Sequence, residues 1–186
     1  MLMVTACNFA LAQAVQSAEE RHLPFSVGVG VSDFDTYWAV GNRMLGGTFW
    51  ADWNPGMLPA KLGGLGLEIE ARDISLGRSS DQPSNLREDT ASGNLVYRWR
   101  RYRNFHPYGK AGLGMGSIDF QFDIPGYSHD TRTVYSLGGG LEYRAYRNVW
   151  VRADYEYQSW GTLLGTTFHP QGVTLGAMYS FRGPRR

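Results

Sequence analysis

Carboxylates and basic side chains recur at every second position in several segments, as in the run Glu68, Glu70 and Arg72. Such groups could form an acid–base pair, a metal site or a network of ion pairs. Alternate residues of an extended strand share one face, so charges on neighbouring strands would face one another. We expect one ion-pair network from Glu68, Glu70, Arg72, Arg98, Arg100, Lys110, Glu142, Arg144, Arg152, Asp154 and Glu156.

The four histidines offer little for catalysis or metal binding. His22, His106, His129 and His169 do not follow a spacing that places two ligands on one face. Ser128, His129 and Asp130 are sequence neighbours, whereas the members of a catalytic triad normally converge from separate elements. The glycine-rich run at 112–116 precedes no helix, which argues against a phosphate loop. We therefore expect no catalytic residue, metal or cofactor, and no enzyme.

Composition limits the fold class. The 186 residues include 24 Gly, 9 Phe, 6 Trp and 11 Tyr, but only 19% are charged, which does not suit a helical bundle. A net charge of +1 gives no support for nucleic-acid binding, and a single cysteine excludes a disulfide scaffold. Apolar residues alternate with Gly or charged residues in eight segments, which predicts an all-β fold. These segments are 25–32, 45–53, 65–72, 94–101, 108–116, 134–145, 149–157 and 173–181.

The N-terminal residues have a different pattern. Residues 1–14 are uncharged and end in alternating alanines, which is typical of a signal peptide cleaved after Ala14. The basic residues with which a signal peptide usually begins are missing, since the first basic residue is Arg21. We therefore expect a remnant of a signal peptide whose true translation start lies upstream. A lipid anchor on Cys7 and a short amphipathic helix remain alternatives. We expect an N-terminal segment at 15–23, the barrel at 24–181 and a tail at 182–186.

The connections between the strands alternate in length. Long polar or aromatic segments are expected at 32–43, 75–92, 119–131 and 158–171. The other connections are mostly short, with 54–62 as the exception. Long loops at one end and short turns at the other predict an eight-stranded antiparallel up-and-down transmembrane β-barrel.

The direction of the apolar face decides whether such a barrel is soluble. A narrow eight-stranded lumen accommodates long charged side chains only beside small residues, and glycine shares the charged face here. Aromatic girdles at both ends would mark membrane interfaces. For these girdles we expect Phe25, Trp53, Tyr108, Tyr143 and Phe181 at one end and Tyr135, Tyr157 and Trp160 at the other. A soluble lipocalin-like barrel that binds a small ligand would have the two faces inverted.

Two segments carry a family resemblance. GVTLGAMYSF at 172–181 resembles the closing strand of bacterial outer-membrane barrels, and HPYGKAGLGMG at 106–116 is similar to their recurring strand. Between Phe25 and Phe181 the chain resembles the small OmpA-like or OmpX-like class. The resemblance implies the outer membrane of a Gram-negative type of bacterium, with outer-membrane lipids and the barrel assembly machinery as partners. It implies an assembly signal in Tyr179 and Phe181, although the family's phenylalanine is usually the last residue.

The barrel prediction favours a structural or surface-interacting role, with ion pairs filling the lumen and little or no open pore. Loop aromatics are candidate contacts for an extracellular ligand or membrane anchors: Tyr37, Trp38, Phe122, Tyr127 and Trp160. A small porin-like channel remains an alternative, and so does an outer-membrane lipid-modifying enzyme. The lipid A deacylases resemble this chain in size and strand pattern, but their His-x-Ser motif does not occur here.

Overall fold

Eight strands make up the regular structure of the described part of the chain. The computed structural model describes residues 25–36, 43–55, 64–75, 86–101, 103–120, 129–162 and 167–181. The strands are β1 (Phe25–Asp35), β2 (Arg43–Trp53), β3 (Leu65–Ser75), β4 (Leu86–Arg98), β5 (Phe105–Phe120), β6 (His129–Tyr146), β7 (Val149–Trp160) and β8 (Gln171–Ser180). Within these ranges, no helix is long and apolar enough to cross a membrane.

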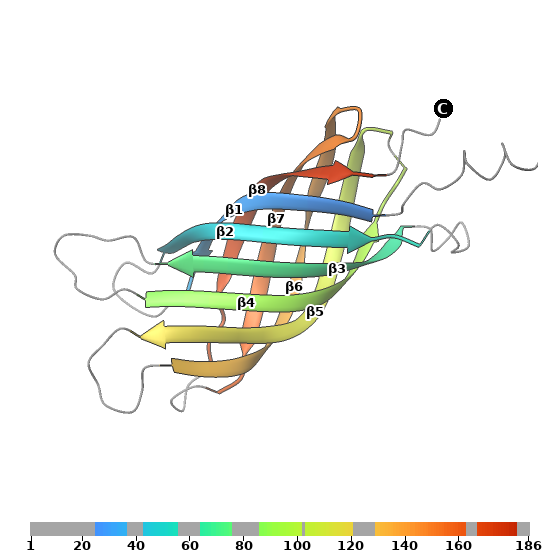
Figure 1. The fold of residues 1–186 in the computed structure, drawn as a ribbon. Coiled ribbons are helices and arrows are strands. Elements are labelled where there is room, and N and C mark those ends of the chain that lie inside the picture. Colours follow the sequence, from blue (N-terminus) through green and yellow to red (C-terminus); the bar gives the residue numbers. More distant parts are fainter. Residues whose placement is uncertain are drawn as a thin grey trace, which may run out of the picture.

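The strands form one closed barrel. Each strand pairs antiparallel with its sequence neighbour, and β8 returns to pair with β1, for example through Val27 opposite Tyr179. The predicted eight-stranded antiparallel up-and-down barrel is therefore confirmed. The start of β1 and the end of β8 lie at the same end (Figure 1), which we call the terminal rim. The opposite end, where β1 runs toward β2, is the loop rim.

The apolar face of every strand points away from the lumen. Ile69 and Leu137 are 69% and 65% exposed on the outside, whereas Glu68 on the adjacent position is buried. Closure leaves no unpaired strand edge, so the wall satisfies its own backbone hydrogen bonds and suits a lipid environment. The inverted faces of a soluble lipocalin-like barrel are absent from the described strands.

Two aromatic residues that we expected in the outer girdles lie in the lumen instead. Tyr108 and Trp160 are 3% and 2% exposed. The reason is the period of the strand: Tyr108 has the opposite parity to outward Leu113, and Trp160 has the opposite parity to outward Tyr157. The expectation that Trp160 is a loop contact is wrong for the same reason.

The strands extend further toward the loop rim than the sequence pattern indicated, and β4, β5 and β6 do so most. β4 begins at Leu86, inside the segment expected to be a loop, and its first residues pair with β5 through Leu86 opposite Phe120. The exposed ion pair from Arg87 to Asp73 links this extension to β3 at 2.8 Å. β5 and β6 likewise continue into residues 119–131. These polar extensions are paired strand because alternation persists there despite the loss of hydrophobicity.

Several predictions lie outside the described residues. These are the signal remnant at 1–14, the N-terminal segment at 15–23, the tail at 182–186 and the loop aromatics Tyr37, Trp38, Phe122 and Tyr127.

Candidate functional site

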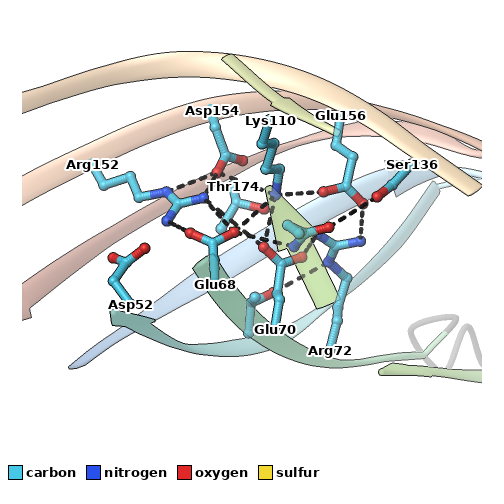
Figure 2. Close-up of polar contacts among 12 residues, drawn as sticks. Asp52, Glu68, Glu70, Arg72, Lys110, Ser136, Arg152, Asp154, Glu156 and Thr174 are labelled. Carbon is cyan, nitrogen blue, oxygen red and sulfur yellow. Dashed lines mark hydrogen bonds and ion pairs between the residues drawn. The ribbon is translucent and has the colours of Figure 1, made fainter. Parts of the chain in front are cut away.

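Lys110 lies at the centre of a cluster of buried charges in the lumen. Its Nζ is 2.7 Å from Glu70 Oε2 and 2.5 Å from Glu156 Oε2. The Glu68 Oε1 and Asp154 Oδ2 atoms are further away, at 3.9 and 3.7 Å. The ammonium on β5 therefore faces carboxylates from both β3 and β7 (Figure 2), which lie on opposite sides of the barrel.

Two arginines connect the same carboxylates. Arg152 Nη1 pairs with Glu68 Oε2, and its Nη2 lies 2.7 Å from Asp154 Oδ2. Arg72 Nη2 pairs with Glu70, while Arg72 Nη1 is 3.1 Å from Glu156 Oε1 across the lumen. Figure 2 shows these contacts forming a continuous network rather than separate pairs. Each bridge between β3 and β7 fixes the two walls relative to each other.

A second group of buried ion pairs lies nearer the terminal rim. Arg98 Nη2 donates to Asp52 Oδ1 at 2.7 Å, and Arg98 Nε donates to Glu142 Oε1 at 2.8 Å. The sequence reasoning missed Asp52, although it alternates correctly with outward Ala51 and Trp53. We use "charged layer" for the buried charged residues of both groups, which are Asp52, Glu68, Glu70, Arg72, Arg98, Lys110, Glu142, Arg152, Asp154 and Glu156.

Aromatic rings pack against the charged layer. The hydroxyl of Tyr108 donates to Asp154 Oδ2 at 2.7 Å. The guanidinium of Arg152 lies 4.8 Å from the Tyr108 ring centroid and 4.7 Å from that of Trp50. Stacking of this kind suits arginine, whose planar cation is weakly hydrated. The two rings therefore fill space beside Arg152 without removing its ion pairs.

Two of the eleven residues expected in the network lie elsewhere. Arg100 is exposed in the turn that follows β4, because the strand ends at Arg98 and alternation no longer applies. Arg144 is half-buried near the terminal rim, with its guanidinium 4.8 Å from the Trp150 ring centroid. The remaining nine belong to the charged layer.

Apolar side chains fill other parts of the lumen in two clusters. Toward the loop rim, the "apolar layer" consists of Phe34, Met44, Ile74, Leu86, Ile118, Val134 and Trp160. Trp50, Trp150 and Met178 on β2, β7 and β8 form a second cluster, in which the Trp50 ring lies beside Arg152 of the charged layer. Glycine makes this packing possible, since a Cβ on Gly116 would overlap the Trp160 ring and one on Gly28 would overlap Trp50. Indole rings, and not only ion pairs, therefore use the space that glycine provides.

One carboxylate is buried within the apolar layer. Glu88 is 1% exposed and lies between Ile74 on β3 and Ile118 on β5. Neither of its oxygens has a hydrogen-bond partner within the described part of the chain. Sequence reasoning missed Glu88 because it fell in an expected loop.

Two of the described histidines, His106 and His169, pack against separate aromatic rings. His106 stacks on Trp150 with ring centroids 4.6 Å apart, and His169 stacks on Tyr157 at 5.6 Å. His129 begins β6, in a segment that we expected to be a loop. No group of three or more His, Cys, Asp or Glu among the described residues could hold a metal ion.

The residues of the expected assembly signal lie on the outer surface where β8 meets β1. Tyr179 and Phe181 are exposed, and their ring centroids are 5.1 Å apart in an edge-to-face arrangement. Phe181 also stacks on Phe25 at 6.1 Å, and its amide donates to the Phe25 carbonyl at 3.0 Å. These aromatics therefore cover the seam between the first and last strands.

Comparison with known structures places the barrel among small outer-membrane proteins. Neisserial surface protein A matches with a TM-score of 0.68 at 15% identity, over 84% of this chain and 97% of that one. Ail, the attachment invasion locus protein of Yersinia pestis, matches with a TM-score of 0.58 at 18% identity, over 83% and 96%. A major outer membrane protein from Thermus thermophilus gives 0.54 at 11% identity, over 83% and 98%.

Sequence comparison gives the family. A search of curated proteins found no match. The family model of the outer membrane protein beta-barrel domain matches residues 3–181, which is nearly the whole chain. This chain therefore belongs to the outer membrane protein beta-barrel domain family, and its location is the bacterial outer membrane.

Proposed function

We propose that this protein is a closed outer-membrane barrel with a structural or surface-interacting role and little or no open pore. The observation that carries the proposal is the filling of the lumen by the buried side chains of the charged layer and of two apolar clusters. An eight-stranded barrel is just wide enough to be filled by side chains. The ion pairs join opposite walls, so their side chains cross the route that an ion would take.

Single-channel recording in planar bilayers tests the closed lumen. We expect low conductance from the unaltered protein and a clear increase from Trp160→Ala, which removes the largest side chain of the apolar layer. Leu137→Ala on the lipid-facing surface is the matched control and should leave conductance unchanged. Large, stable conductance from the unaltered protein would instead identify a small porin-like channel.

We place the terminal rim in the periplasm and the loop rim outside the cell. Bacterial barrels have short periplasmic turns and longer extracellular loops. The terminal rim contains the two-residue turn at 147–148, whereas β3 and β4 are joined at the loop rim by residues 76–85. The extracellular connections are then the surface available to an external ligand. Ail, a structural neighbour, has been solved in complex with the heparin analogue sucrose octasulfate.

Tyr179 and Phe181 are proposed as the signal recognised by the barrel assembly machinery. Both rings are exposed on the last strand, as such a signal requires. We expect Phe181→Ala to lower severalfold the amount of folded barrel in the outer membrane, measured by the mobility of unboiled protein on a gel. Phe25→Ala removes the same ring stack from the first strand and is the control. If both variants lower the amount of folded barrel equally, the ring stack between Phe25 and Phe181 is what folding requires, and Phe181 is not an assembly signal.

The proposal includes no catalytic activity. Its support is the pairing of the carboxylates of the charged layer with cations and the separate packing of His106 and His169 against aromatic rings. Mass spectra of lipid A from cells with and without the protein would expose a lipid-modifying activity as a change in acyl composition.

A further inference from the structure

Among the described residues, the exposed charge at the terminal rim is of one sign. Arginines project from the turn between β4 and β5 and from the end of β6 and its turn into β7. We call Arg100, Arg101, Arg103, Arg144 and Arg147 the "arginine patch"; all are exposed except half-buried Arg144. Among the described residues of this rim no Asp or Glu is exposed, since Asp52 and Glu142 are buried beside Arg98. The patch is therefore a strongly positive surface.

The two turns that carry the patch lie side by side. The amide of Arg144 donates to the carbonyl of Asn104 at 2.9 Å, and Phe105 pairs with Tyr143 across β5 and β6. The guanidinium groups are thus collected over neighbouring strands rather than spread around the rim. Arg101, Arg103, Arg144 and Arg147 form no ion pair with any described residue, and the Arg144 Nε is buried without a hydrogen-bond partner there.

At the loop rim, exposed arginines are paired with carboxylates. There Arg43 pairs with Asp33, and Arg87 pairs with Asp73 at 2.8 Å. These exposed arginines are therefore neutralised by carboxylates of the same chain. Arg101, Arg103 and Arg147 of the patch have no such carboxylate among the described residues, and their charge is available to an external anion.

The backbone at Arg147 gives independent support. Arg147 has a φ of 31°, in the left-handed region that glycine or asparagine normally occupies in a two-residue hairpin turn. A long side chain is unfavourable in this conformation. Its guanidinium lies 5.4 Å from the Tyr146 ring centroid, so the cation stands beside an exposed aromatic ring. Backbone strain of this kind is found more often at functional sites, so Arg147 is a candidate for a role outside folding.

The depth of the patch in the membrane indicates its partner. Exposed aromatic side chains, including Trp99, Phe105, Tyr143 and Tyr146, lie next to the arginines. Such rings mark the level of the headgroups at a membrane interface. Guanidinium groups at that level meet lipid phosphates, which they can bind through two parallel hydrogen bonds.

We propose that the arginine patch binds anionic phospholipid headgroups of the inner leaflet of the outer membrane. The leaflet assignment rests on the proposed orientation, while the recognition of anionic phospholipid does not. Basic residues at a membrane surface gain affinity from negatively charged lipid, roughly fivefold for each residue. The patch would thereby hold the barrel at a fixed depth and select its lipid neighbours on one side.

The test uses the full chain in nanodiscs of phosphatidylcholine mixed with phosphatidylglycerol, where both barrel ends meet the same lipids. Native mass spectrometry of the released barrel measures which lipid it retains. We expect retention to favour phosphatidylglycerol and the preference to fall at least about fivefold in R101Q/R103Q/R147N. Asparagine tolerates the left-handed turn conformation, so this variant keeps the fold, which the gel mobility of unboiled protein checks.

Two further variants sharpen the test. R101K/R103K/R147K should retain most of the preference, because charge is kept, and R87Q at the loop rim should change nothing. Equal retention of both lipids by the unaltered protein would overturn the proposal. Binding to purified peptidoglycan through the same arginines, without a lipid preference, would also overturn it. None of these readouts depends on conductance, so the closed-lumen proposal stands or fails separately.

Discussion

The ion pairs of the lumen and those of the loop rim are formed by the same types of residue, but the first are buried and the second are exposed. Arg152 is fully buried against Glu68 and Asp154, whereas Arg87 is 54% exposed beside Asp73 and Asp89. In water an ion pair contributes little, because solvent screens the attraction and the ordering of two long side chains opposes it. In the lumen each charge has lost its water and depends on its partners. The comparison teaches that burial, and not the number of ion pairs, determines what a pair does for this barrel.

The largest effect is expected from removing a buried cation. Arg152→Met keeps side-chain bulk but leaves Glu68 and Asp154 with fewer opposing charges. We expect the free energy of unfolding to fall by about 3–5 kcal/mol, measured by urea denaturation of the folded barrel in lipid vesicles.

A paired variant serves as the control for this prediction. Removing both partners in Glu68→Gln/Arg152→Met should restore part of the loss, since less charge remains uncompensated. A single Arg152→Met variant as stable as the unaltered protein would mean that the lumen is hydrated enough to solvate these carboxylates.

The smallest effect is expected at the loop rim. Arg87→Gln breaks exposed pairs with Asp73 and Asp89 and should lower the free energy of unfolding by at most about 1 kcal/mol. Salt screens exposed charges, so even this difference should shrink when the denaturation is repeated at high ionic strength. A loss as large as that of Arg152→Met would erase the distinction between the two regions.

The sequence predicted the strands and their faces well, because a strand in a membrane barrel must alternate between lipid and lumen. The same rule, applied strictly, would have placed Tyr108 and Trp160 inside and found Asp52. Tyr108 and Trp160 were assigned to the outer girdles because they are aromatic, and Asp52 was overlooked because it is the single charge in the expected strand at 45–53. Arg100 shows the converse error, since alternation was extended beyond the end of β4.

The sequence did not show which charged residues of the lumen pair with one another. Arg152 and Glu68 are separated by 84 residues and meet across the barrel, so their contact depends on the stagger of all the intervening strands. Glu88 was hidden because hydrophilic composition resembles a loop, while only its neighbours on β3 and β5 show that the segment is a strand.

The seam between β1 and β8 has a consequence for how the protein is made. The strand that completes the wall is the last one in the chain, and its partner is the first. A chain that stops short of β8 would present two bare edges to hydrocarbon, where their amides and carbonyls have no alternative partners. The backbone groups of the wall can therefore all be paired in lipid only after the chain has been made through β8.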